Sequence, residues 1–245
     1  FSVEEYKRPR FEVVFDPVTG SYKLGSVVKV KGRAMAYAGS PVDHATVKYR
    51  VVRNAYYPFY DYWRGYFPHS EEAEIAHGEV KTTGDGSFNI AFTAVPDALR
   101  MKGYTPVFNY TVHVDITDIS GETHAGEKTI SVGEKSLLID LEMGEKVNRD
   151  EAKSFGITTT NLNGAKQATE VSVSIIRLQA PDRPFRERKW GKPDVYLIPR
   201  EEFVGMFPDI EYDDENDRSA WKAVRTVFDK EINTGRDSLI RPEDL

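Results

Sequence analysis

The first half of the chain alternates apolar and polar residues with a period of two, in one segment after another. Within residues 27–37, for example, Val28 and Val30 alternate with Lys29 and Lys31. Successive side chains of a strand point to opposite faces, so this period places the apolar side chains on one face. A half-buried antiparallel sheet requires that arrangement. The pattern therefore constrains this half of the chain to antiparallel β-structure.

Seven strands are expected in the first half, at residues 11–15, 27–37, 45–53, 74–82, 88–93, 107–117 and 121–132. Turn residues separate them, among them Gly39-Ser40-Pro41 and Ser120-Gly121. Gly84-Asp85-Gly86 predicts a tight hairpin, because Gly accepts the positive φ of such turns. Many short strands with almost no helical periodicity indicate a β-sandwich, although a barrel shows the same pattern.

The second half begins a new series of strands. These are expected at residues 137–143, 155–161 and 171–178, with Leu162-Asn163-Gly164 as the turn between the last two. Prolines, glycines and charges predict a long irregular insertion over about 181–218. A helical turn with Asp217 or Ser219 as its N-cap and a strand at 226–234 should follow. If this domain is a full sandwich, its last strands lie beyond Leu245.

Length and composition narrow the function classes. The chain has 245 residues, enough for one or two domains, and because it begins on Phe we interpret it as a piece of a longer protein. Its formal net charge of −6 argues against nucleic acid as a partner, since phosphate binding needs a basic face. No apolar run approaches the ~20 residues of a membrane helix, so we expect no direct membrane contact.

The chain contains no cysteine. This excludes a disulfide-stapled module and a cysteine nucleophile. It also excludes an internal thioester within this piece, because that bond needs a cysteine sulfur.

The N-terminal stretch FSVEEYKRPRFEVVF predicts two short extended segments with a kink at Pro9. It resembles the segment that leads into the third macroglobulin-like domain of α2-macroglobulins and complement proteins, which has the pattern F-x-V-x-E-Y-x-x-P-x-F-E-V. The residues that match this pattern are Phe1, Val3, Glu5, Tyr6, Pro9, Phe11, Glu12 and Val13. Among these proteins, the likeness is greatest to the large bacterial α2-macroglobulin-like proteins.

The resemblance implies an all-β fold of two tandem macroglobulin-like, immunoglobulin-like antiparallel sandwiches, the third and fourth such domains of the family. Residues 1–7 would form a linker strand, 8–133 the first sandwich, and 134–245 the second sandwich with its insertion. The resemblance further implies a non-catalytic scaffold segment of a protease-trapping inhibitor. Its partners would be the neighbouring domains of the parent chain and, for the full-length protein, proteases. It also implies an extracytoplasmic location, in the periplasm or at the cell surface, with a lipid anchor upstream. No cofactor is expected.

Two charged segments raise alternatives of their own. The acidic run 209–217 suggests calcium, but it lacks the central Gly and the final Glu of an EF-hand loop, so a solvated acidic loop is favoured. The basic and aromatic segment 183–192 suggests a nucleic-acid strand. Because the acidic run follows closely and can neutralise it, we favour an Arg stacked on Trp190 that fixes the insertion.

Catalytic and metal-binding patterns are missing from the sequence. The histidines have no metal-ligand spacing and are interpreted as surface or structural residues: His44, His69, His77, His113 and His124. His113 is expected to face solvent beside Thr111 and Asp115. No GxSxG or P-loop motif occurs. Carboxylates that are adjacent in a strand point to opposite faces, so a hydrolase with a carboxylate site ranks last.

The most unusual composition lies in the loop before the fourth expected strand, where eight of the 29 aromatic residues fall within twelve positions. They form the candidate interaction surface: Tyr56, Tyr57, Phe59, Tyr60, Tyr62, Trp63, Tyr66 and Phe67. Tyr and Trp rings are typical of binding surfaces. A contact within the parent protein is the favoured interpretation. The alternative is an extracytoplasmic adhesion module that binds a carbohydrate or a protein through this loop.

Overall fold

The computed structural model describes residues 10–56, 72–97, 106–144, 147–148, 154–186 and 191–242. Within these ranges the chain is nearly all β-structure, which confirms the expected fold class. The chain divides into two compact units. One unit holds Phe1–Asp140 and Thr158–Gln167, and the other holds Leu141–Ile157 and Ala168–Leu245.

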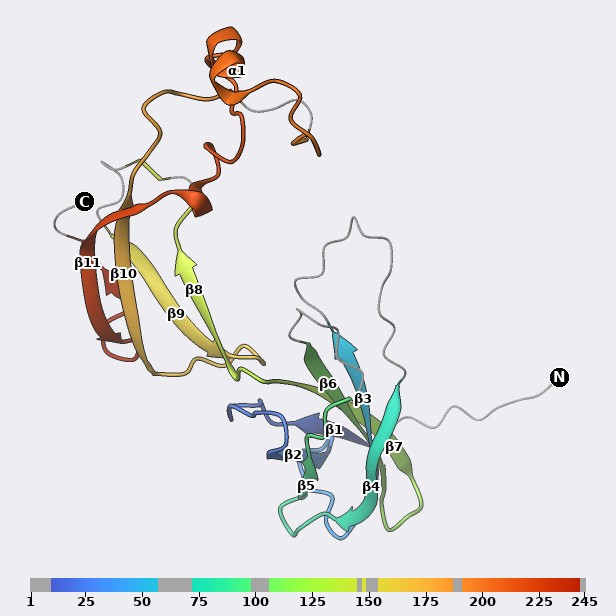
Figure 1. Cartoon of the computed structure of the whole chain (residues 1–245). Helices are drawn as coiled ribbons and strands as arrows, with labels where there is room; N and C mark the ends of the chain where they lie inside the picture. Colours follow the sequence, from blue (N-terminus) through green and yellow to red (C-terminus); the bar gives the residue numbers. More distant parts are fainter. Residues whose placement is uncertain are drawn as a thin grey trace. The chain divides into compact units, whose positions relative to one another are not determined.

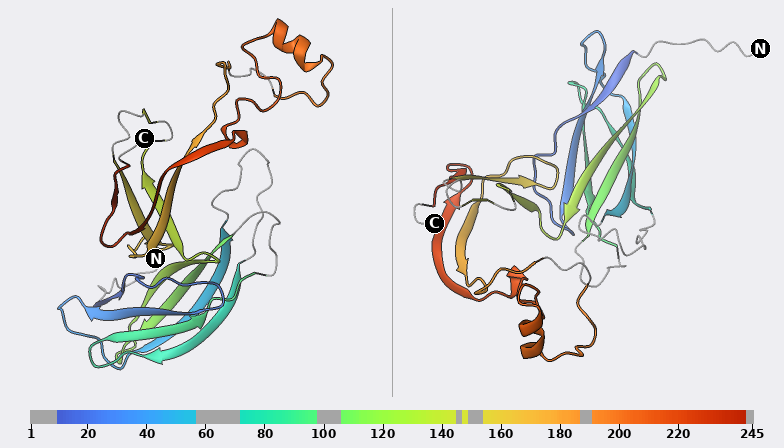
Figure 2. Two further views of the ribbon diagram at one scale, coloured as in Figure 1. Left: turned by 60° about the vertical axis from the view of Figure 1, so that its left-hand side comes forward. Right: turned by 90° about the horizontal axis from the view of Figure 1, so that it is seen from above.

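The first unit is a sandwich of two antiparallel sheets (Figure 1, Figure 2). One sheet has the order β1-β2-β5, and the other has the order β4-β3-β6-β7. All seven expected strands are present: β1 (Phe11–Phe15), β2 (Val27–Ala36), β3 (Thr46–Tyr56), β4 (Ala73–Lys81), β5 (Ser87–Thr93), β6 (Val107–Thr117) and β7 (Thr123–Gly133).

The alternating residues build the core between these sheets. In β6 every second side chain is buried, from Phe108 to Ile116, and Val28 and Val30 of β2 are buried in the same cluster. Gly32 interrupts the apolar series of β2 for a steric reason. A Cβ at this position would collide with the ring of Phe88 on the paired strand β5. The large aromatic ring therefore requires a glycine opposite it.

The prediction of a hairpin at Gly84-Asp85-Gly86 is wrong, although the chain does turn at these residues. The strands on either side, β4 and β5, belong to different sheets, and β5 pairs with β2. The turn closes on itself, since Thr83 N donates to Ser87 O at 2.9 Å and Gly86 has φ +76°. Local turn chemistry fixes the reversal of the chain, but burial of apolar faces decides which strand becomes the partner.

The second unit has a smaller core. The order β12-β9-β8 makes one sheet, and β10 pairs antiparallel with β11 in another. Phe155, Ile157, Ile232 and Ile240 are the buried residues of this core. The strands expected in this half are present: β8 (Leu137–Glu142), β9 (Phe155–Asn161), β10 (Glu170–Leu178) and β11 (Ala223–Asn233), followed by β12 (Leu239–Ile240).

Between β10 and β11 lies the predicted insertion, and it is less irregular than expected. It contains a short helix, α1 (Arg200–Met206), which follows Pro199 and carries Glu201 and Glu202 in its first turn. Acidic residues there favour a helix through the N-terminal partial charge. Seven residues are too few for a clear helical period, which explains why the sequence did not reveal α1.

The helical turn expected after the insertion is present as a single 3-10 turn, Arg218–Ala220. Asp217 caps it as predicted, because its carboxylate accepts a hydrogen bond from Ser219 N at 2.9 Å. Among the described residues, no helix is both long and apolar enough to cross a membrane.

Candidate interaction surfaces

The aromatic loop proposed from sequence lies almost entirely outside the described residues. Tyr56 ends β3, and the other seven aromatic residues of the loop lie outside the described residues. Trp190 and His69 lie outside them as well. The two hypotheses for the loop therefore stay predictions.

The segment 158–167, at the end of strand β9, contributes a buried polar site to the first unit. Residues 158–167 belong to the first unit, and Asn161 lies there with 0% of its surface exposed. Its Nδ2 donates to the carbonyl oxygens of Val18 and Gly20, both at 3.0 Å. Its Oδ1 accepts from the backbone N–H groups of Asn163 and Ala165, both at 2.9 Å. The hydrogen-bonding capacity of this buried amide is thus used on backbone.

Two further amides continue this site. Asn163 Oδ1 accepts from Ser131 N at 2.8 Å, and Asn163 Nδ2 donates to Ser131 O at 3.1 Å. Gln167 Nε2 donates to Thr19 O at 2.7 Å. We call Asn161, Asn163 and Gln167 the amide clasp. The sequence predicted the turn at Asn163 but not the clasp, because its backbone partners lie more than a hundred residues away for two of the three amides.

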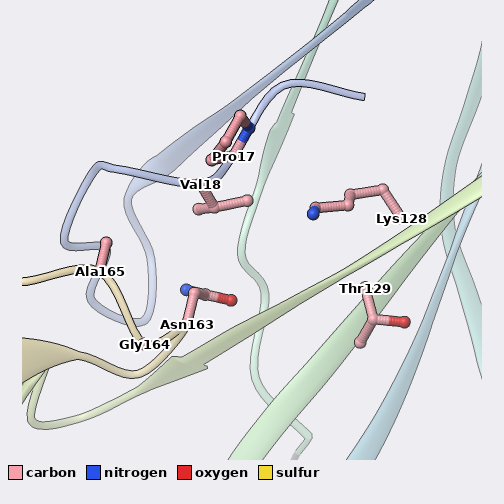
Figure 3. A pocket seen from close by; sticks show the side chains of 7 residues that line it. All are labelled: Pro17, Val18, Lys128, Thr129, Asn163, Gly164 and Ala165. Atoms are coloured by element: carbon pink, nitrogen blue, oxygen red, sulfur yellow. The ribbon is translucent and has the colours of Figure 1, made fainter. Parts of the chain in front are cut away.

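A shallow pocket of about 280 Å³ lies beside the clasp (Figure 3). Among its lining residues only Lys128 is charged, and its side chain extends toward Val18. A single ammonium group without an acidic partner does not form a general acid–base pair. The lining residues are Pro17, Val18, Lys128, Thr129, Asn163, Gly164 and Ala165.

A largely buried arginine, Arg53, organises the end of the first sandwich. Arg53 donates to the carbonyl oxygens of Val95 and Pro96 at 3.1 and 2.7 Å, and to the carboxylate of Asp97 at 3.1 Å. The Tyr110 hydroxyl donates to the same Val95 oxygen at 2.9 Å. Burial raises the pKa of Tyr110 to about 12. These bonds tie the chain after β5 to strands β3 and β6, which is a structural role.

The described histidines lie beside carboxylates rather than together. His44 contacts Asp43, His77 contacts Glu74, His113 contacts Glu127, and His124 contacts Glu122. His113 is partly exposed on the outer face of β6, the face on which the sequence predicted it. In the described part of the chain, no group of three or more His, Asp or Glu is arranged to hold a metal ion.

The insertion brings its basic and acidic segments together, as the sequence suggested. Arg186 Nε lies 3.0 Å from Asp209 Oδ2, and Arg200 Nη2 lies 2.7 Å from Glu215 Oε1. Lys192 Nζ bridges Asp214, at 3.1 Å, and Asp213. The hydrogen bonds that Lys192 donates to Asp213 and Asp214 raise the pKa of Lys192, and the bond that Asp213 accepts from Lys192 lowers the pKa of Asp213. An internal ammonium group thus occupies the place where a cation would bind this acidic run.

The same insertion holds an aromatic cluster that the sequence analysis missed. The rings of Tyr196 and Tyr212 are stacked with centroids 4.4 Å apart, and Phe203 meets Tyr212 edge-on at 5.4 Å. Phe203 also contacts Phe207 at 5.2 Å. The cluster borders a cavity of about 230 Å³. Its spread over 17 positions of an irregular segment gave no periodic signal in the sequence.

Comparison with known proteins gives a distant structural likeness. No protein-family model matches the chain, and no curated protein matches it. The native structure of Escherichia coli α2-macroglobulin is similar with a TM-score of 0.44 at 8% identity, over 95% of this chain and 14% of that one. Salmonella α2-macroglobulin reacted with methylamine gives 0.44 at 8% identity, over 94% and 15%.

A third structure, E. coli α2-macroglobulin activated by porcine elastase, gives a TM-score of 0.43 at 12% identity, over 100% of this chain and 20% of that one. The chain thus spans between 14% and 20% of the length of these structures. By its fold, the chain belongs to the class of antiparallel β-sandwich proteins. These three structures are bacterial α2-macroglobulins.

Proposed function

We propose that this chain is a non-catalytic framework segment of a bacterial α2-macroglobulin-like inhibitor that traps proteases. The observation that carries the proposal is the fully buried Asn161, whose amide makes four hydrogen bonds to backbone groups of the first unit and so fixes the fold.

The sequence motif supports the same assignment. Phe11 and Val13, which match the family pattern, lie in β1. Phe11 is buried in the sandwich core and meets His124 edge-on at 4.3 Å. Val13 packs against that core. These two residues of the pattern therefore help to build the first sandwich, whereas the expected linker strand 1–7 and the pattern residue Pro9 lie outside the described residues.

The built polar groups of the first unit also favour a framework role. The clasp amides and Arg53 direct their hydrogen bonds mainly to backbone carbonyl and N–H groups. Such bonds hold the chain in one conformation and leave those atoms without a role in chemistry. We propose neighbouring domains of the parent chain and, for the whole protein, proteases as partners. The proposal includes an extracytoplasmic location and a lipid anchor elsewhere in the full-length protein.

The test uses the full-length protein and an added serine protease such as trypsin. After cleavage, we expect the protease to remain active on a small chromogenic peptide and to lose activity on a large protein substrate, because it is confined. Size-exclusion chromatography should show that the two proteins elute together. Cleavage without confinement, with equal activity on both substrates, would contradict the proposed function.

A further inference from the structure

The part of the insertion between Gly191 and Asp217, here called the insertion head, exposes large apolar side chains. Leu197 is 91% exposed and Val195 69% exposed, and Phe207 is also exposed. Helix α1 contributes no buried side chain. Single apolar residues on a surface are ordinary, but these lie in the same short segment as an aromatic cavity.

The cavity has the form of a receptor for one apolar side chain. It measures about 230 Å³ and is lined by Pro193, Tyr196, Phe203, Phe207, Ile210, Glu211 and Tyr212. The Tyr196 hydroxyl donates to Asp213 at 3.1 Å and the Tyr212 hydroxyl to Ile198 O at 3.0 Å. These bonds fix the two stacked rings, so the wall of the cavity is preformed. Preformed aromatic walls are typical of sites that accept proline or aliphatic side chains.

Charge identifies the kind of occupant. Residues 191–217 contain nine acidic and two basic residues, a formal net charge of −7, in a chain whose total is −6. The two basic residues, Lys192 and Arg200, are already paired with carboxylates of the same segment. Arg186, from outside this segment, adds one more positive charge beside Asp209. The segment that forms the cavity therefore carries an excess of negative charge, and one of its carboxylates, Glu211, lines the cavity itself.

We propose that the insertion head is a docking surface for an extended, basic segment of a partner protein. An aliphatic or proline side chain of that segment enters the aromatic cavity, while its Lys or Arg residues face the carboxylates around it. Complementary charge speeds association and excludes acidic competitors. Nucleic acid is excluded on the same ground, because its phosphates would be repelled.

The test measures binding of three synthetic peptides to the 245-residue chain by isothermal titration calorimetry. The first peptide alternates Lys with Leu and Pro. The second replaces each Lys by Glu, and the third replaces each Leu and Pro by Ser and Gly. We expect the first to bind at least tenfold more tightly than the other two, with an affinity that falls as salt is raised.

Variants assign the binding to the insertion head. The double variant Leu197→Ser with Phe207→Ser should lose binding at least tenfold, whereas Ile119→Ser, at a site in the first unit that is 89% exposed, should leave it unchanged. If the double variant fails to fold by circular dichroism, Glu201→Gln with Glu202→Gln should weaken binding and its salt dependence. Equal binding of the first and third peptides, equal binding of the first and second, no binding at all, or full binding by the folded variants would overturn the proposal.

Discussion

The side-chain amide of Asn163 makes two hydrogen bonds to the backbone of Ser131. Its Oδ1 accepts from the Ser131 N–H at 2.8 Å, and its Nδ2 donates to the Ser131 carbonyl oxygen at 3.1 Å. The side-chain amide thus replaces a backbone peptide at this position of β7. Asn161 adds four bonds from a fully buried position. Together they hold residues 158–167 in the first unit.

Replacing Asn163 by Ala should lower the free energy of unfolding by about 1–3 kcal/mol, because the Ser131 N–H and carbonyl lose their partner. Urea denaturation measures the change. Asn89→Ala is the matched control, since Asn89 is an exposed residue of β5, and it should change stability by less than about 0.5 kcal/mol. Equal effects of the two substitutions would show that the bidentate contact contributes nothing.

Gly32→Ala should destabilise the first sandwich by about 1–3 kcal/mol, because the added methyl group collides with the Phe88 ring. Gly84→Ala introduces the same methyl group where no atom lies within 4 Å, and it serves as the control. The collision also predicts coupling. In a double-mutant cycle, Phe88→Leu should cost less in the Gly32→Ala background than alone. Additive effects would rule out a direct clash.

The turn around Asp85 predicts a dependence of stability on pH. Hydrogen bonds from the Thr83 and Ser87 side chains and from Ser87 N hold the pKa of Asp85 well below its usual range. A carboxyl group whose pKa is lower in the folded state stabilises the fold at pH values above its unfolded pKa, about 3.9, and loses that contribution as pH falls below it.

Asp85→Asn should therefore be less stable than the wild type at pH 7, and the difference should shrink as the pH is lowered from about 4. Thr83→Val removes the largest cause of the lowered pKa and should reduce the same pH dependence. Thermal unfolding between pH 2 and pH 7 checks both variants. A difference between Asp85→Asn and the wild type that stays constant over this range would contradict the prediction.

The strands were predictable because burial of one face imposes a period of two, as in β6, where Phe108, Tyr110 and Val112 are all buried. Which strands pair with each other was harder to predict from the sequence. Gly84-Asp85-Gly86 looks like a hairpin turn, yet the strand that follows it pairs with β2. A turn specifies only its own few dihedral angles, whereas the choice of sheet depends on contacts between distant residues.

The candidate surfaces were less predictable than the fold. The pairing of the basic and acidic segments of the insertion followed from their opposite charges and short separation, as Arg186 and Asp209 show. The role of Asn161 did not follow. An Asn at the end of a strand suggests a turn residue, and nothing local indicates that its amide reaches Val18 and Gly20.

Native-state hydrogen exchange of the 245-residue chain tests most directly whether residues 158–167 fold as part of the first sandwich. We expect the amides of Asn163 and Ala165 to open with the same free energy as those of β7, and Asn161→Ala to lower both together. Exchange of these two amides that is already fast in the wild type, or protection of β7 that is unchanged in Asn161→Ala, would contradict the framework account.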